Sequence, residues 1–121
     1  MSEPTDLPDA VRRVEIQALS RSLPFRVVRT QTIARTAQEA AEAVSAEVGQ
    51  IVKSLVFRGR DTGRAYLLLV SGANRVDERV VAETVGEALE RPDSDFVREA
   101  SGFAFGGVAP LGATTPLPTF M

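Results

Sequence analysis

Two apolar runs separated by a short polar segment place the strongest constraint on how this chain can fold. The first run spans residues 51–57, the second spans residues 65–70, and the segment Gly59–Gly63 stands between them. Apolar runs of this length joined by a glycine-containing turn predict a β-hairpin. Because both runs are apolar at consecutive positions, both faces of the hairpin are expected to be buried. Other elements must therefore cover the hairpin on each side.

Capping signals and short apolar stripes predict those covering elements. A proline suits the first position of a helix, a Thr-x-x-Glu sequence is typical of a helix start, and a glycine is typical of a helix end. These signals predict helices over 8–22, from Thr36 to Gly49, from Asp77 to Gly86, and over 92–100 with Gly102 closing the helix. Strands are predicted at 25–28, at 50–58, at 65–70, in the segment that runs from Gly102 into the glycine pair, and at the entry to 116–121.

The order of these elements predicts an α+β fold. A chain of 121 residues with 44% hydrophobic content is long enough for one domain with one core. Hairpins mixed with short helices favour a layered domain over a doubly wound parallel sheet. We therefore expect residues 1–121 to form a single domain whose mixed, mostly antiparallel or barrel-like sheet has flanking helices.

Two absences narrow the possible chemistry. The chain contains no cysteine and no histidine. It therefore has no thiol nucleophile, no thiolate metal site, no Ser-His dyad and no imidazole base that titrates near pH 7. We expect neither a metal nor a cofactor. Any catalysis must use lysine, carboxylates, hydroxyls, backbone amides or the substrate itself.

The charge balance indicates which partners to expect. A net charge of −2 provides no basic surface that could coat a nucleic acid, so we expect no DNA partner and limited contact with any RNA. No apolar run approaches the roughly 18 residues that a membrane-spanning helix needs. The acidic N-terminus lacks a signal-peptide pattern, and we expect a cytoplasmic protein without a membrane partner.

Lys53 is the single lysine among thirteen arginines, and it interrupts the first apolar run. Strand alternation places its side chain on the face of Leu55 and Phe57, at or beside the core. Burial of an unpaired ammonium group costs several kcal/mol, so such a lysine is expected to serve a pocket or a partner anion. The alternative is a lysine whose head reaches water from a strand end. A chain that otherwise uses arginine favours the functional interpretation.

A glycine pair, Gly106–Gly107, follows the last aromatic residues, and Pro110 stiffens the exit from it. Glycines at such a point let backbone approach a ligand closely and leave amides free to donate to it. A structural bulge or tight turn explains the same pair without a ligand, and the pair alone favours that explanation.

Three segments together resemble a known family. They are residues 48–57 around Lys53, residues 70–77 with the sequence Val-Ser-Gly-Ala-Asn-Arg-Val-Asp, and residues 102–112 followed by Leu117-Pro118-Thr119. Their order, spacing and residue types are similar to the YbaK/ProX family of aminoacyl-tRNA deacylases, which is related to the editing domain of bacterial prolyl-tRNA synthetase. The resemblance covers roughly residues 10–121. It implies an editing domain that hydrolyses the ester between a wrong, small amino acid and its tRNA.

The resemblance also implies roles for individual residues. Lys53 matches the essential lysine of the family, which holds a phosphate near the terminal adenosine of the tRNA. Gly106 and Pro110 match the G-x-x-x-P loop, whose backbone positions the aminoacyl carbonyl and the attacking water. Ser54 matches a position that shapes the amino-acid pocket, and Gly107 and Asn74 are expected to bind the substrate. We expect Lys53 and the Gly106–Pro110 backbone to line one cleft.

The family also implies a mechanism and leaves alternatives open. A terminal ribose hydroxyl helps to activate water in the family, so no protein base is required. Lys53 and Ser54 are neighbours in a strand and face opposite sides, which excludes a Ser-Lys nucleophilic dyad. Because family domains continue past Thr119 with a strand and a helix, the resemblance implies a domain shortened at its C-terminus. A non-catalytic module that binds tRNA or a synthetase such as prolyl-tRNA synthetase is the alternative function, and the oligomeric state stays open.

Overall fold

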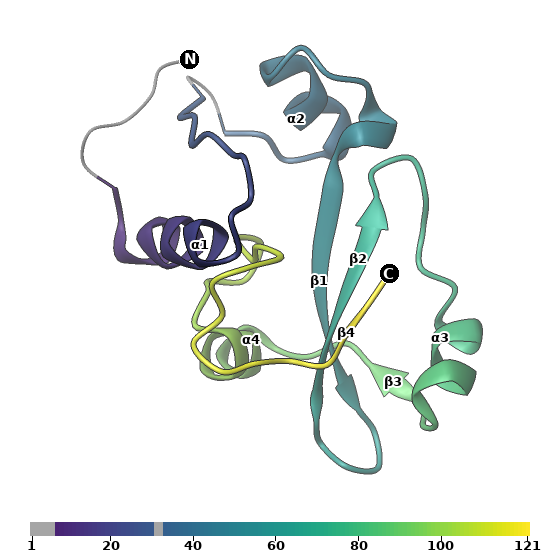
Figure 1. Cartoon of the computed structure of the whole chain (residues 1–121). Helices are drawn as coiled ribbons and strands as arrows, with labels where there is room; N and C mark the ends of the chain where they lie inside the picture. Colours follow the sequence, from purple (N-terminus) through teal and green to yellow (C-terminus); the bar gives the residue numbers. More distant parts are fainter. Residues whose placement is uncertain (1–6, 31–32) are drawn as a thin grey trace.

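The computed structural model describes residues 7–30 and 33–121, and it forms one α+β domain around a central hairpin (Figure 1). The two strands of that hairpin, β1 and β2, are long, whereas the other two strands of the sheet have two residues each. The elements in chain order are α1 (Asp9–Ser20), α2 (Ala37–Ala43), the 3₁₀-helix η1 (Val48–Gln50), β1 (Val52–Gly59), β2 (Ala65–Ser71), α3 (Glu78–Val85), β3 (Leu89–Glu90), α4 (Ser94–Ser101) and β4 (Thr119–Phe120).

The sheet is open, with the strand order β3-β1-β2-β4. The hairpin pairs β1 with β2 in an antiparallel register that runs from Val52 opposite Ser71 to Arg58 opposite Ala65. β3 is antiparallel to β1, whereas β4 is parallel to β2. The prediction of a mixed, mostly antiparallel sheet is thus confirmed. The sheet does not close into a barrel, because two-residue strands form both of its edges.

Each face of the hairpin has its own hydrophobic cluster. On one face Phe57, Tyr66 and Leu68 pack with Leu89, and α3 contributes partly buried valines to the same cluster. On the other face Val56 and Leu67 pack with Val97 of α4, together with Val108 and Leu117 from the C-terminal segment. Figure 1 shows α3 on one side of the hairpin and α4 on the other. The predicted burial of both faces is confirmed for the middle of the hairpin, whereas Val52 at its open end is 54% exposed.

The helices α1, α3 and α4 lie close to the positions that their capping and terminating residues predicted. Asp77 caps α3 by accepting from the amides of Arg79 and Val80, and Gly86 ends the helix in the left-handed conformation. α4 begins two residues later than predicted, because Asp93 is the residue that caps it. α1 falls inside the predicted range of 8–22.

Three predictions of local structure were wrong. Residues 25–28 form no strand in the described structure. The segment after Gly102 is likewise irregular, since Gly102 ends α4 with a φ of +79° and the chain then turns. α2 ends at Ala43 rather than near Gly49, because a turn with Ser45 at positive φ precedes η1. The strand β3 was not predicted, since two residues carry no periodicity.

Helix α1 is fastened to the irregular C-terminal segment by side chains. The Arg13 guanidinium donates to the carbonyl of Gly112 at 2.9 Å and to that of Gly102 at 2.7 Å. It also lies over the ring of the buried Phe103, 5.1 Å from the ring centre. Gln17 accepts from the Gly112 amide. These contacts hold both ends of the segment 102–112, so its shape is set by α1 as well as by its own sequence.

The carboxylate of Glu87 holds the turn of the hairpin. It accepts from the amides of Asp61 and Thr62, each at 3.0 Å, and from the hydroxyls of Thr62 and Tyr66, each at 2.7 Å. These hydrogen bonds, led by the Thr62 hydroxyl, lower the pKa of Glu87 from 4.5 to about 2. A depressed pKa means that ionised Glu87 stabilises the fold above about pH 4.5, and that this contribution is lost as the pH falls toward 2.

We therefore expect Glu87→Gln to lower the melting temperature at pH 7, because the neutral amide replaces four charge-assisted acceptor contacts. The difference from the wild type should shrink as the pH falls from about 4.5 to about 2. Thermal melts across this pH range measure both effects. Glu90→Gln is the matched control, because Glu90 forms a 3.7 Å ion pair with Arg58 in which both side chains are nearly half exposed. Equal melting curves for the wild type and Glu87→Gln at pH 7 would contradict this assignment.

Candidate functional site

Lys53 is a half-buried residue near the open end of the hairpin, and the hydrogen bond made by its ammonium group is exposed. Its Nζ donates to the backbone carbonyl of Asn74. No carboxylate in the described parts of the chain forms an ion pair with it. One carbonyl uses only one of the three ammonium donors and leaves the positive charge unbalanced. Lys53 can therefore accept an anionic ligand that the described residues do not supply.

The segment that supplies this carbonyl is folded tightly against the start of β1. The Gly72 amide donates to the Ile51 carbonyl at 2.6 Å, and the Ser71 hydroxyl donates to the Gly49 carbonyl at 2.7 Å. A Cβ atom at Gly72 would lie 2.4 Å from the Val48 carbonyl oxygen, which a side chain cannot do. Glycine is therefore required here by the close approach of two backbone segments. The tight fold determines where Asn74 presents its carbonyl to Lys53.

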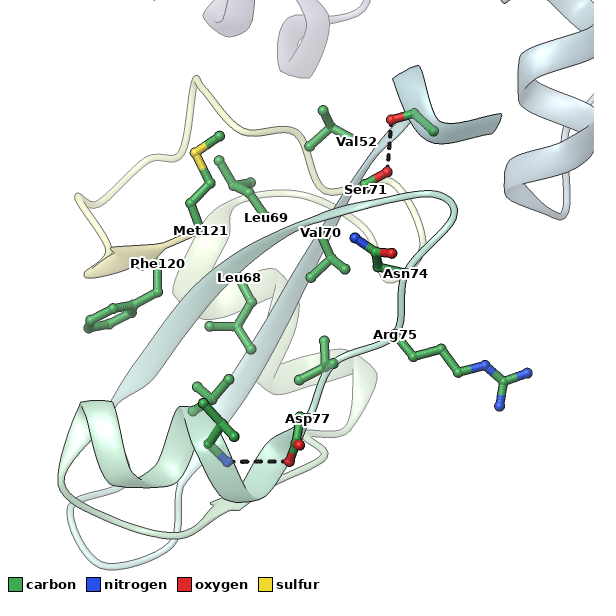
Figure 2. A pocket seen from close by; sticks show the side chains of 14 residues that line it. Val52, Leu68, Leu69, Val70, Ser71, Asn74, Arg75, Asp77, Phe120 and Met121 are labelled. Atoms are coloured by element: carbon green, nitrogen blue, oxygen red, sulfur yellow. Dashed lines mark hydrogen bonds between the residues drawn. The ribbon is translucent and has the colours of Figure 1, made fainter. Parts of the chain in front are cut away.

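A cavity of about 580 Å³ lies beside Lys53, between β2, α3 and the end of the chain (Figure 2). Its walls are mostly aliphatic, and Asn74 and Asp77 add polar groups to the lining. Val70, which is paired with Lys53 in the hairpin register, lines the cavity, although Lys53 itself does not. Figure 2 shows the Arg75 side chain directed away from the cavity and Phe120 and Met121 at the opposite end. The cavity is lined by Gly49, Val52, Leu68, Leu69, Val70, Ser71, Asn74, Arg75, Val76, Asp77, Val80, Val81, Phe120 and Met121.

Ser54 lies next to Lys53 in β1 and therefore points to the opposite face of the sheet. It is half-buried and stands opposite Leu69 in the register. This alternation agrees with the prediction that Lys53 and Ser54 cannot form a catalytic dyad. Ser54 faces the side of the sheet on which the C-terminal segment packs.

The loop that contains Gly106 and Gly107 is a tight turn. The Gly107 amide donates to the Ala104 carbonyl at 2.9 Å, and Gly106 has a φ of +83°. Because Phe105 has no positive φ, these values describe a type II turn with Gly106 at its third position. The turn interpretation of the glycine pair is thus correct. A ligand role is compatible with it, because the Gly106 amide has no acceptor among the described residues and an added Cβ there would meet no atom within 4 Å.

The two parts of the predicted site lie on different faces of the sheet. Alternation along β1 places Lys53 on the face of Leu55 and Phe57, whereas Val108 of the loop packs with the cluster on the other face. The cavity beside Lys53 is lined by Asn74 but by no residue of Gly106–Pro110. The single cleft that Lys53 and the Gly106–Pro110 backbone were expected to line is therefore not formed on one face of the sheet. Lys53 is, however, the second residue of β1 and so lies one position from the end of this strand, around which one face of the sheet passes into the other.

Further groups that could contribute chemistry are few in the described parts of the chain. Residues 7–30 and 33–121 contain no group of three or more acidic side chains that could hold a metal ion. None of their helices has the length and apolar character that crossing a membrane requires. The predicted site residues offer one ammonium group, one hydroxyl, one side-chain amide and backbone amides.

Comparison with known proteins identifies the family. Residues 32–121, which include β1, β2 and the glycine loop, match the sequence profile described as the aminoacyl-tRNA editing domain. The chain belongs to this family. The match covers Lys53, Ser54, Asn74 and the Gly106–Pro110 loop, and it begins after α1. The part of the chain that matches the profile is therefore the part that carries the candidate site.

Relatives of this chain include an uncharacterized protein and part of a proline–tRNA ligase. The chain is 30% identical over 86 residues to the uncharacterized protein YwhH of Bacillus subtilis strain 168, covering 71% of this chain and 54% of that protein. It is 32% identical over 80 residues to a proline–tRNA ligase of Thermosipho africanus strain TCF52B, covering 65% of this chain and 14% of the ligase. The chain thus spans about half the length of the first relative and a small part of the second.

A solved structure supports the same fold. The crystal structure of a proposed trans-editing enzyme for prolyl tRNA synthetase superimposes with a TM-score of 0.84 at 50% sequence identity. The match covers 94% of this chain and 72% of that one.

Sequence reasoning missed the residues that hold the glycine loop in place. Arg13 and Gln17 lie 89 to 99 residues away from the glycines they contact, and nothing in the local pattern of α1 indicates those contacts. Phe105 was also missed as a candidate, although its ring is 68% exposed beside the glycine pair. An aromatic residue directly before two glycines was the signal available for it.

Proposed function

We propose that this editing domain hydrolyses the ester bond of tRNA carrying a wrongly attached small amino acid. The observation that carries the proposal is the ammonium group of Lys53, which has one carbonyl partner and no carboxylate partner among the described residues. A compact cation of this kind suits a phosphate of the tRNA 3′ end. Membership of the aminoacyl-tRNA editing family supports the choice of this substrate class.

In the proposed reaction, a water oxygen attacks the aminoacyl carbonyl carbon and the ester C–O bond breaks. The terminal ribose oxygen leaves and takes a proton, which releases free amino acid and intact tRNA. With no histidine or cysteine in the chain, the protein contributes positioning and electrostatic stabilisation, and a ribose hydroxyl of the substrate helps to activate the water. The reaction requires no covalent enzyme intermediate.

Each candidate residue has a defined task in this proposal. Lys53 holds a phosphate, and Asn74 positions Lys53 through its carbonyl. The free Gly106 amide donates to the carbonyl oxygen or to the water, while Gly107 and Pro110 keep the loop in the shape that presents this amide. Ser54 lies on the loop side of β1 and limits the size of the amino-acid pocket. A substrate bound around the end of β1 contacts both faces of the sheet.

A synthetase is the proposed protein partner. The net charge of −2 leaves few phosphate contacts for tRNA, so the isolated domain should bind tRNA weakly. A similar segment lies within a proline–tRNA ligase, and the solved relative is connected by name with prolyl tRNA synthetase. Prolyl-tRNA synthetase is therefore the first partner to test.

A non-catalytic binding module is the second candidate function. The observation that favours it is the position of Lys53 and the glycine loop on opposite faces, which suits a surface that holds an RNA end without acting on it. Both functions use Lys53, so binding data alone do not separate them.

Turnover separates the two functions. Protein and tRNA charged with alanine, serine, threonine or cysteine are mixed at about one protein to twenty tRNAs, and the remaining charged tRNA is measured over time. A deacylase removes the amino acid from more than one tRNA per protein molecule for at least one of these substrates. A binding module slows spontaneous hydrolysis in proportion to its concentration. If no substrate is cleared faster than without protein, the deacylase proposal is wrong.

A further inference from the structure

We propose that Phe105 is a stacking site for a nucleobase of the single-stranded 3′ end of tRNA. This inference rests on the proposed function and adds a recognition residue to it. Phe105 is a large aromatic residue with 68% of its surface exposed, whereas Phe103, two residues before it, is 3% exposed. Both rings belong to the same short segment, so the difference arises from how the turn directs them.

The turn that contains Phe105 directs this ring outward. Phe105 occupies the second position of the type II turn formed by the 2.9 Å hydrogen bond from the Gly107 amide to the Ala104 carbonyl. Gly106 at the third position supplies the required φ of +83°. The two residues after Phe105 have no side chains, so nothing in Gly106–Gly107 covers the ring from that side.

The base of this turn is held firmly. Phe103 donates its amide to the buried Ser101 hydroxyl at 3.1 Å, and Arg13 stacks on the Phe103 ring while binding the Gly102 carbonyl. The Thr114 amide donates to the Ser101 carbonyl at 3.1 Å and closes the segment at its far end. The exposed ring therefore stands on a packed support, which lowers the entropy that a ligand must remove when it binds.

The surroundings of the ring favour a nucleobase over a charged or bulky ligand. Residues 104–110 contain no charged side chain, so no carboxylate in this stretch repels RNA. The Gly106 amide next to the ring has no acceptor in the described chain and can donate to the sugar or the ester of a stacked nucleotide. Bases stack on exposed aromatic rings independently of sequence, and loss of such a ring weakens binding by on the order of tenfold or more.

The test compares variants at Phe105 with a short RNA that ends in CCA and carries 2-aminopurine as its last base. Stacking on an aromatic ring quenches the fluorescence of 2-aminopurine. We expect quenching with the wild type and with Phe105→Trp, and its loss with Phe105→Ala and with Phe105→Leu, which keeps an apolar side chain without a planar ring. Ile16→Ala, which removes an exposed apolar side chain from α1, is the control and should quench as the wild type does.

A kinetic measurement provides the second readout. Phe105→Ala and Phe105→Leu should raise KM for charged tRNA about tenfold and change kcat by less than about twofold. The inference is overturned if the leucine variant quenches and binds as the wild type does, or if the wild type gives no quenching, in which case Phe105 is a protein contact or plain surface. If the wild type deacylates nothing, the proposed function fails, and the fluorescence result alone then decides the stacking site.

Discussion

Replacing Lys53 with alanine is expected to lower kcat/KM for deacylation by on the order of a hundredfold or more, with the fold unchanged. The ammonium group is the charge proposed to hold a tRNA phosphate, and the protein offers no other lysine. The fold should persist because Lys53 makes a single hydrogen bond within the described chain, to the Asn74 carbonyl at a half-buried position. Initial rates and a thermal melt on the same preparation measure both parts of the expectation.

Lys53→Arg and Arg91→Ala sharpen this test. Arginine keeps the charge but spreads it over a planar fork, so Lys53→Arg should also lose most of the activity if a point charge is required. Arg91 is exposed, and its removal changes the net charge of the protein by the same amount, so Arg91→Ala should retain wild-type rates. Near-normal turnover by Lys53→Ala would remove Lys53 from the site. A parallel loss in Arg91→Ala would show that overall charge, rather than position, is responsible.

Replacing Gly107 with alanine should lower kcat/KM by on the order of a hundredfold while changing the melting temperature little. Gly107 has no positive φ, and an added Cβ would lie 3.5 Å from the Ala104 carbonyl oxygen, an ordinary contact. The methyl group would instead project from an exposed loop that is proposed to lie against the aminoacyl ester. A displacement of the ester by about 1 Å is sufficient for a loss of this size.

Gly106→Ala needs a control for backbone strain. Its φ of +83° disfavours any side chain, so this variant should lose stability as well as activity. Gly86 has a φ of +97° and, like Gly106, no atom within 4 Å of an added Cβ, which makes Gly86→Ala a matched measure of strain alone. We expect similar losses of stability in the two variants and a loss of activity in Gly106→Ala only. Full activity in a folded Gly107→Ala protein would show that the loop is merely a turn.

Local signals predicted the elements that depend on neighbouring residues. The β1–β2 hairpin, the Asp77 cap of α3 and the left-handed Gly86 that ends it follow from side chains that interact within a few positions. Local signals failed where a partner far along the chain decides the structure. β3 was not predicted, and it is a strand because Leu89 and Glu90 pair with Gly59 and Arg58, about thirty positions earlier. Residues 25–28 have strand-like composition but form no strand in the described structure.

By itself the sequence determined the hairpin, the chemical classes open to the chain and the singular lysine in its first strand. Those conclusions need only the composition of the chain and the periodicity of its apolar residues. That periodicity is a pattern among residues that lie close together in the sequence. The tertiary structure decided which carbonyl accepts a hydrogen bond from Lys53. It also placed Lys53 and the glycine loop on opposite faces of the sheet, and it brought Arg13 of α1 to the segment that contains this loop. These contacts join residues 21 to 99 positions apart, where hydrogen-bond geometry and packing, rather than any local preference, select the partners.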